Sequence, residues 1–361
     1  MYTRVLSKPD GRALRLYSRR PIPETIVSPP STPQGAPANS HMRWHPLRRE
    51  WVAYAQHRQD RTFLPPPDHN PLAPSDDPKR PSELPVGDYD VAVFDNLFPT
   101  FSENATAHPP EIVDTRPGKG ACEVVVFTQD PSQSLGRLPL SHIELILEVW
   151  GDRYDDLGRR PDVQYVMPFE NRGVEVGVTL HHPHGQIYAY PFVPPVPATE
   201  LAAQLEYQRQ HRCGLLEHLF AEEIKDGRRT LYVSDEAIAV VPVCARYAYE
   251  VWIAPRRAAS SFADVTPAER AEIARALKTV LLKFDRLWDK PFPYVMVVHQ
   301  APTDGSAHPE AHLHIEFYPP YRMRDRLKYI AGSELGAGAF TADTLPEAKA
   351  AELRAVEVSL E

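Results

Sequence analysis

The stretch His182-Pro183-His184-Gly185-Gln186 alternates polar side chains with two residues whose side chains carry no polar group. In an extended strand, side chains at i, i+2 and i+4 share one face. We therefore expect both imidazoles and the Gln186 amide in one row, with Pro183 and Gly185 on the opposite face. There a bare backbone can approach a neighbour or a ligand closely. Burying such a row is costly without partners, so it indicates a polar strand edge, half of a metal site or a catalytic site.

The same order of elements occurs twice in the chain, which indicates an internal duplication. Each unit runs from a β-type segment through a capped amphipathic helix and a second strand to a polar row. Glu123 corresponds to Glu250, and His182 to His312, at nearly equal offsets. Two such units predict an α+β fold built twice. Strands are expected at 122–127, 163–166, 249–253 and 294–298, and the second polar row at 312–316.

Capping boxes predict where two of the helices begin. The first box is Ser141–Glu144, and the second is Thr266–Glu269, with Pro267 at the first helical position. A third helix, from about Thr199 to Lys225, is expected to bridge the two units. Apolar residues recur on one face of each capped helix: Ile143, Ile146, Leu147 and Trp150 in the first, and Ile273, Leu277, Val280, Leu281 and Phe284 in the second.

Length and composition limit the possible classes of protein. The 361 residues can form two domains or one duplicated domain, and a hydrophobic content of 42% allows a buried core. A net charge of −8 offers no basic surface for nucleic acid. The sequence has no run of about 18 apolar residues that could span a membrane, and its start shows no secretory signal. Three scattered cysteines, Cys122, Cys213 and Cys244, favour a reducing cytoplasm.

The pattern divides the chain into four segments. Residues 1–41 are expected to form a hairpin around Pro9-Asp10-Gly11, followed by a proline-rich arm. Residues 42–197 are the first half, which carries the histidine row. Residues 198–345 are the second half, and residues 346–361 form a C-terminal tail.

Two further motifs accompany the histidine row. Phe169-Glu170-Asn171-Arg172-Gly173 lies upstream, and Phe317-Tyr318-Pro319-Pro320 lies downstream. Together with the histidine row and the Ile-Tyr-Ala that follows it, they resemble the galactose-1-phosphate uridylyltransferase family, a branch of the histidine-triad superfamily. The resemblance runs from about residue 43 to about residue 347. It implies two fused half-barrels, each an antiparallel sheet flanked by helices, and a homodimer that acts on small molecules.

The resemblance also implies a reaction. His184 takes up UMP from UDP-glucose as a covalent uridylyl group, and galactose 1-phosphate then accepts it in a ping-pong double displacement. A neutral imidazole is a suitable nucleophile toward phosphorus, because near pH 7 one ring nitrogen is unprotonated. The other ring nitrogen would donate to a backbone carbonyl close to His182. Gln186 would donate to a phosphoryl oxygen, and Gly185 would let the backbone approach the phosphate.

Further positions match substrate contacts of the family. Arg58 and Arg61 suit phosphate through their forked donors, although by themselves they fit a solvated basic turn equally well. Phe98 is of a type found more often in a core than against a ligand. The nucleotide contacts implied by the resemblance are Arg58, Arg61, Asn96, Phe98, Asn171, Gly177 and Thr179.

The acceptor sugar is implied to contact a segment near the C-terminal end. Lys328 and Glu334 match residues that in relatives reach across a dimer and hold the phosphate and a sugar hydroxyl. An ordinary amphipathic turn explains these two residues equally well without the resemblance. Phe340 stands where better-known relatives have a glutamine. Since polar contacts of this kind reject the wrong sugar, galactose specificity stays open.

Many relatives carry a zinc site that includes two cysteines and the first histidine of the motif. The corresponding positions here are Asn70, Ala73, Pro131 and His182. Four ligands cannot be assembled from this set without thiolates, so we expect no structural zinc there. Nearby His69 is expected to be a surface histidine.

A second metal site is better preserved. Glu200, His299, His314 and Glu316 fall where the family places a structural metal, with Glu316 in the position of a histidine. Carboxylate and imidazole ligands suit zinc or iron. The alternative is a hydrogen-bonded polar row left by the duplication, in which His312, His314 and Glu316 share one face.

Three functions remain open from the sequence. The first is a nucleotidyltransferase acting on UDP-hexoses, and Lys328 and Glu334 favour its sugar acceptor. The second is a nucleoside-diphosphate-sugar or dinucleoside-polyphosphate phosphorylase that uses the same His184 with phosphate as the acceptor. The third is a non-catalytic nucleotide binder, which the intact His184 and Gln186 argue against.

Overall fold

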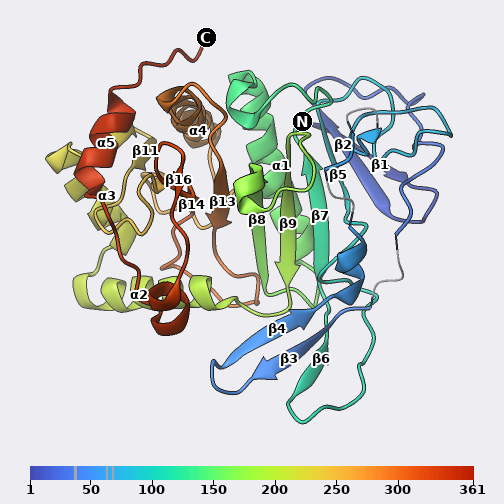
Figure 1. Cartoon of the computed structure of the whole chain (residues 1–361), viewed down its shortest axis with the longest axis horizontal. Coiled ribbons are helices and arrows are strands. Elements are labelled where there is room, and N and C mark those ends of the chain that lie inside the picture. Colours follow the sequence, from blue (N-terminus) through green and yellow to red (C-terminus); the bar gives the residue numbers. More distant parts are fainter. Residues whose placement is uncertain (36–38, 62–63, 67–68) are drawn as a thin grey trace.

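One antiparallel sheet runs through the molecule and joins the two halves of the chain (Figure 1). The structure is a computed structural model that describes residues 1–35, 39–61, 64–66 and 69–361. The first half contributes, in spatial order, β1 (Tyr2–Ser7), β2 (Ala13–Ser18), β5 (Val91–Asp95), β7 (Ala121–Val126), β9 (His184–Tyr190) and β8 (Tyr165–Arg172). The second half continues with β13 (Tyr294–His299), β14 (His314–Tyr318), β12 (Val251–Pro255), β11 (Ala237–Val240) and β10 (Thr230–Val233).

The two halves meet where β8 pairs with β13, and Tyr294 lies opposite Arg172. Outward from this junction, each half places its polar-row strand next, β9 or β14, followed by β7 or β12. The predicted class, α+β with antiparallel sheets flanked by helices, is confirmed. The segment boundaries at residues 41, 197 and 345 stay predictions, because a continuous sheet does not define them.

Two long helices cover the junction on one face of the sheet. α1 (Leu140–Gly158) and α4 (Pro267–Leu287) pack against each other, and Figure 1 shows them side by side. The apolar stripes expected for both helices are buried. They belong to one hydrophobic core that extends through both halves, with Trp150 and Phe284 among its largest side chains.

The two predicted capping boxes have different outcomes. At Thr266 the box is confirmed, because the hydroxyl accepts the Glu269 backbone N–H at 3.2 Å and Glu269 Oε2 accepts the Thr266 N–H at 2.8 Å. The box at Ser141 is wrong. α1 begins at Leu140, directly after Pro139, whose extended backbone (φ −55°, ψ 148°) takes the cap position without a side-chain hydrogen bond.

The connection between the halves is also different from the prediction. A single helix over 199–225 is wrong, since α2 (Pro195–His211) ends before α3 (Leu215–Asp226) begins. Arg212 adopts a left-handed conformation (φ 59°) and ends α2. Gly214 then precedes α3 with extended backbone, so the chain turns between the two helices.

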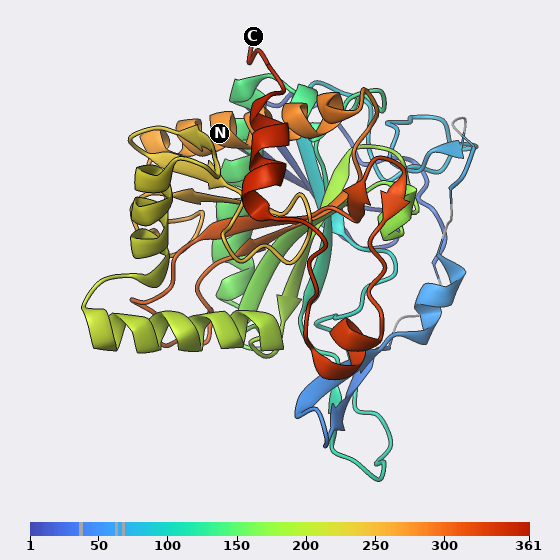
Figure 2. The same cartoon turned by 60° about the vertical axis from the view of Figure 1, so that its left-hand side comes forward.

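A smaller sheet stands apart from the main one and consists of β3 (His41–His45), β4 (Glu50–Tyr54) and β6 (Thr115–Pro117). One turn of π-helix, η5 (Ser333–Ala337), lies beside its hairpin, and Arg48 donates to the Leu335 carbonyl at 3.2 Å (Figure 2). The remaining elements are short: η1 (Gln56–Asp60), η3 (Leu135–Arg137), η4 (Val174–Val176), β15 (Tyr321–Met323), β16 (Arg326–Leu327) and α5 (Pro346–Arg354).

The N-terminal segment begins with the predicted hairpin. β1 and β2 pair in antiparallel register on either side of Pro9-Asp10-Gly11, and β2 pairs with β5 at the edge of the main sheet. The described part of the arm that follows, 19–35 and 39–40, contains neither helix nor strand. Across the described residues, every helix is too short or too polar to cross a membrane.

Candidate active site

The strand β9 presents alternate side chains to two different environments. His184 and Gln186 are half-buried on one face, while Gly185 and Ile187 are buried on the other. These two polar side chains therefore share a face, as the alternation predicted. The prediction that His182 lies in the same row is wrong, because β9 begins only at His184. The backbone bends at His182. The last hydrogen bond between the two chain segments is donated by the Phe127 N–H, directly after β7, to the Pro183 carbonyl at 3.1 Å.

The His184 ring is held in one tautomer. Its Nδ1 lies 2.6 Å from the carbonyl of His182, and a carbonyl can only accept, so Nδ1 carries the hydrogen. Nε2 then bears the free lone pair and has no hydrogen-bond partner within the described ranges. Burial lowers the pKa of His184 below 6.5, and the bond to the carbonyl opposes this only in part. The ring is neutral at pH 7 and can act as a nucleophile through Nε2.

His182 supports this arrangement from behind. Its side chain is 2% exposed, and both ring nitrogens have partners. Nε2 lies 2.7 Å from the Thr128 carbonyl, and Nδ1 lies 3.0 Å from Nδ2 of Asn70. The carbonyl fixes the hydrogen on Nε2, so Nδ1 accepts from the Asn70 amide. Asn70 thus holds the His182 ring by one hydrogen bond. The backbone carbonyl of His182 in turn accepts a hydrogen bond from His184 Nδ1.

The same contacts test whether a zinc ion fits in the first half. The amide nitrogen of Asn70 faces the lone pair of His182 that a metal would need, and an amide N–H is not a metal ligand. Ala73 and Pro131 carry no donor atom on their side chains. This donor set does not fit a four-coordinate zinc ion. His69 has an interaction partner in the structure, and Asp68 lies outside the described residues.

Two cavities meet at His184. The larger, of about 380 Å³, is bordered by the turn after β8 and by His182, Pro183 and His184. The smaller, of about 110 Å³, is bordered by His184 and Gln186 together with residues of η1, β5 and the loop after it. His184 lines both cavities, so its ring stands at the boundary between them. Groups bound in the two cavities would lie on either side of this nitrogen.

The smaller cavity combines cations with apolar walls. Arg58 and Arg61 both line it, and no carboxylate within the described part of the chain pairs with either guanidinium. The Arg58 guanidinium is fixed by a bond to the Phe98 carbonyl at 2.8 Å. Burial and the neighbouring Arg58 charge lower the pKa of Arg61. Unpaired guanidinium groups in a half-buried pocket are suited to phosphate.

Asn96 determines how Gln186 is oriented. Its Nδ2 donates to Gln186 Oε1 at 3.4 Å, while its own Oδ1 accepts the Phe98 N–H at 2.8 Å. With its oxygen engaged, Gln186 presents its NH₂ group to the cavity as a donor. Asn96 and Phe98 line the smaller cavity beside it, together with Thr179.

The other expected contact residues are distributed differently. Asn171 lines the larger cavity. Gly177 borders neither cavity among the described lining residues and instead ends η4 with a positive φ of 80°. Lys328 and Glu334 pair with each other at 3.2 Å, and neither belongs to the described lining of the two cavities at His184. Lys328 lines a separate hollow near Tyr247.

Gly185 is required for packing on the far face of β9. A Cβ atom there would lie 2.8 Å from the Phe127 ring and 2.9 Å from the Phe169 carbonyl oxygen. Of the two expected approaches, to a neighbour or to a ligand, the one to a neighbour is confirmed at this position, and an approach of the backbone to a phosphate stays a prediction. The close approach is to neighbouring strands and not to the face that carries His184.

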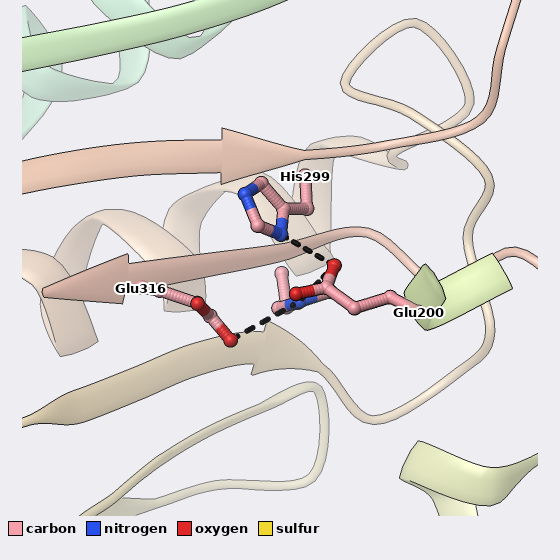
Figure 3. Close-up of side chains that lie close together, drawn as sticks. Glu200, His299 and Glu316 are labelled. Atoms are coloured by element: carbon pink, nitrogen blue, oxygen red, sulfur yellow. Dashed lines mark hydrogen bonds and ion pairs between the residues drawn. The ribbon is translucent and has the colours of Figure 1, made fainter. Parts of the chain in front are cut away.

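The expected metal residues of the second half converge at one point. Figure 3 shows Glu200 from α2 approaching His299 and Glu316 from adjacent strands. The ligand atoms of these three residues and His314 all lie within 4.8 Å of one another. His299 Nδ1 is 2.6 Å from Glu200, and His314 Nε2 lies 3.8 Å from Glu200 and 3.6 Å from Glu316.

Two carboxylates and two imidazoles form a donor set that fits a divalent zinc or iron ion. His314 Nδ1 is 2.8 Å from the His312 carbonyl, which leaves its Nε2 directed at the cluster. The nearby carboxylates raise the pKa of His314 to about 9 despite burial. His312 does not share this face as expected, since it precedes β14 and its Nε2 lies 2.8 Å from the Pro255 carbonyl.

Sequence reasoning missed several residues of the smaller cavity. Leu72, Phe94 and Val124 form its apolar wall, and Glu83 and Pro33 lie at its border. The apolar run Val91-Ala92-Val93-Phe94 does not tell which of its side chains faces a ligand. Glu83 and Pro33 lie in segments without regular structure and carry no signal in the sequence.

A duplicated α+β sheet, with a strand-borne histidine that presents a free ring nitrogen beside two cavities, defines an enzyme suited to covalent transfer through that histidine. Comparison with protein families identifies the family. The model of the galactose-1-phosphate uridyl transferase N-terminal domain matches residues 31–194, and that of the C-terminal domain matches residues 200–360. The chain belongs to the galactose-1-phosphate uridylyltransferase family.

Individual relatives agree with this assignment. A galactose-1-phosphate uridylyltransferase of Thermotoga maritima is 37% identical over 328 residues, which are 88% of this chain and 99% of the relative. One of Streptomyces lividans is 33% identical over 86% of both chains. A solved uridylyltransferase structure superposes with a TM-score of 0.77 at 33% identity, and covers 87% of this chain and 97% of its own.

Proposed function

We propose that this chain transfers UMP from UDP-glucose to galactose 1-phosphate through a covalent uridylyl group on His184. The observation that carries the proposal is the His184 ring, tied at Nδ1 and free at Nε2 where two cavities meet. Relatives named galactose-1-phosphate uridylyltransferase support the choice of donor and acceptor. The chain is thus a nucleotidyltransferase.

In the first half-reaction the uridine lies in the smaller cavity. Arg58 and Arg61 hold the phosphates, and Asn96, Phe98 and Thr179 contact the nucleoside. His184 Nε2 attacks the phosphorus of the UMP group; the N–P bond forms as the P–O bond to glucose 1-phosphate breaks, and that oxygen keeps the electron pair.

Two neighbours assist the nucleophile during this step. The Gln186 NH₂ donates to a phosphoryl oxygen, where negative charge shifts in the transition state. The His182 carbonyl accepts from Nδ1–H and so stabilises the positive charge that the His184 ring acquires when it is uridylylated.

In the second half-reaction a phosphate oxygen of galactose 1-phosphate attacks the same phosphorus, and the N–P bond breaks. The acceptor lies in the larger cavity, beside Asn171. We assign Lys328 and Glu334 to the acceptor site of a second copy, because in their own chain Lys328 lines a separate hollow and Glu334 pairs with it. The proposed assembly is a homodimer in the cytoplasm. Gly177 acts indirectly, by shaping the turn before Thr179.

Glu200, His299, His314 and Glu316 are proposed to hold a zinc or iron ion with a structural role. When bound, the ion neutralises the two carboxylates and links α2 to the β13–β14 pair. Within the described residues, Glu200, His299 and His314 border a hollow distinct from both cavities at His184.

A coupled assay with UDP-glucose and galactose 1-phosphate tests the proposal. His184→Gly should abolish the formation of UDP-galactose, while His218→Ala, a change on exposed α3, should not. Other hexose 1-phosphates in the acceptor position measure sugar specificity through the new UDP-hexose that forms; glucose 1-phosphate is not informative, because it returns the donor UDP-glucose. Specificity needs this measurement because the apolar Phe340 packs against Tyr247 near Lys328. Undiminished activity in the glycine variant would refute the role of His184.

A further inference from the structure

A buried cluster of charges lies beside the smaller cavity and includes one of its lining residues, Glu83. Lys8 and Arg12, from the turn between β1 and β2, both bind the Glu83 carboxylate. Arg12 makes two contacts, of 3.2 and 2.9 Å, and Lys8 Nζ bonds Oε2. The Lys8 side chain is fully buried and Glu83 is 4% exposed. Glu83 lines the cavity, so this ion cluster supports part of its wall.

The same turn also contacts β5, the strand that carries the cavity residue Phe94. Lys8 Nζ lies 3.7 Å from the centre of the Phe94 ring, a cation–π contact. Arg12 donates to the Asp95 carbonyl at 2.8 Å, and Ala13 N–H donates to the Asp95 side chain at 2.9 Å. Residues 8–13 therefore contact two residues of the wall, Glu83 and Phe94, and also Asp95, which directly follows Phe94 in β5.

The arm that follows the hairpin reaches the cavity as well. Pro33 lines the cavity, and the Ser31 carbonyl accepts a hydrogen bond from the Ser82 N–H at 3.3 Å. Gly35 lies so close to Leu97 that a Cβ atom would be 2.8 Å from its side chain. The N-terminal family domain begins to match only at residue 31, so the hairpin is an addition to the matched domain.

Given the proposed function, we propose that the N-terminal hairpin completes the nucleobase end of the UDP-hexose site, with Lys8 and Arg12 as positioning residues for Glu83 and Phe94. The phosphate end of the cavity, at Arg58, Arg61 and His184, already accounts for the charged part of the ligand. The end with Leu72, Phe94 and Val124 is apolar, as a base requires. Buried charge pairs fix such a wall rigidly, because each group loses its partners if it moves.

The test compares a ligand that has a base with one that lacks it. Lys8→Met keeps most of the side chain's length and removes the charge, and binding of UMP and of ribose 5-phosphate is measured by calorimetry. We expect UMP to bind about tenfold more weakly, since one charge-assisted contact to the wall is lost. Ribose 5-phosphate should bind as it does to the wild type. Arg12→Met should likewise weaken the binding of UMP and not that of ribose 5-phosphate. It replaces the Lys8 variant in the test if that variant does not fold.

Arg4→Met is the matched control on the same hairpin. Among the described residues, Arg4 bonds to the carbonyls of Pro23 and Glu24 and does not belong to the lining of the cavity. Its UMP affinity should match the wild type. Equal weakening of both ligands in Lys8→Met, or none, would overturn the role of the hairpin while leaving the transferase proposal intact. A wild-type chain that fails to bind UMP would overturn both.

Discussion

Replacing Asn70 by alanine removes the hydrogen bond that holds the His182 ring. His182 is the residue whose backbone carbonyl fixes the nucleophile His184. The substitution removes the amide that donates to His182 Nδ1 at 3.0 Å. His182 is 2% exposed and its other nitrogen is already bonded to Thr128, so the freed nitrogen cannot find water or a new partner without a shift. Leaving one buried polar atom without a partner costs about 1–3 kcal/mol of unfolding free energy.

Part of that cost should appear in catalysis. The His182 carbonyl, 2.6 Å from Nδ1, fixes the tautomer of His184. If the position of His182 is less fixed, its carbonyl holds His184 less well. His184 Nε2 is then both unprotonated and aligned for a smaller fraction of the time. If about 1.4 kcal/mol of the loss reaches the transition state, the rate of uridylylation falls about tenfold.

Two measurements on the Asn70→Ala variant separate stability from catalysis. Urea unfolding gives the free energy, and a single-turnover burst with UDP-glucose gives the uridylylation rate. Asn70→Asp is the control, because it keeps the shape and the oxygen that accepts the Leu72 N–H but replaces the donor by a carboxylate. That carboxylate should draw a proton onto His182 Nδ1 and raise the pKa of its ring. Wild-type values for both stability and burst rate in Asn70→Ala would refute the reasoning.

Three further predictions follow from the same geometry. Gly185→Ala places a Cβ 2.8 Å from Phe127 and should lower the unfolding free energy by about 1–3 kcal/mol; an unchanged melting temperature would contradict the packing argument. Because burial lowers the pKa of His184, the burst rate should fall in acidic solution as Nε2 is protonated, with a midpoint below pH 6.5; a midpoint above 6.5 would contradict it. Removing bound metal with a chelator should lower the melting temperature, and zinc or iron should restore it in the wild type but less in Glu316→Ala; metal analysis that finds none would contradict the site.

Local patterns in the sequence predicted much of the fold. The alternation around His184 and Gln186 fixed the face on which both lie, because a strand has a strict period of two. The Thr266 box gave a correct helix start, since both of its hydrogen bonds are local. The Ser141 box failed because Pro139 already occupied the cap position, and a four-residue pattern does not register that competition.

The parts of the site that escaped prediction are contacts between distant segments. Asn70 and His182, or Lys8 and Glu83, meet only after the sheet has formed. The four second-half metal residues met as expected, but that expectation came from resemblance to a family, and spacing does not bring Glu200 to His299. At Gly185 both a neighbour and a ligand stayed open, because a sequence does not say which face of a strand is packed.

Mass spectrometry of the intact chain after incubation with UDP-glucose, without an acceptor, tests the central claim most directly. A free Nε2 on His184 predicts a stable mass increase of one UMP group, located on that residue by peptide mapping, and its loss when galactose 1-phosphate is added. No adduct, or an adduct on another residue that persists in His184→Gly, would contradict the account.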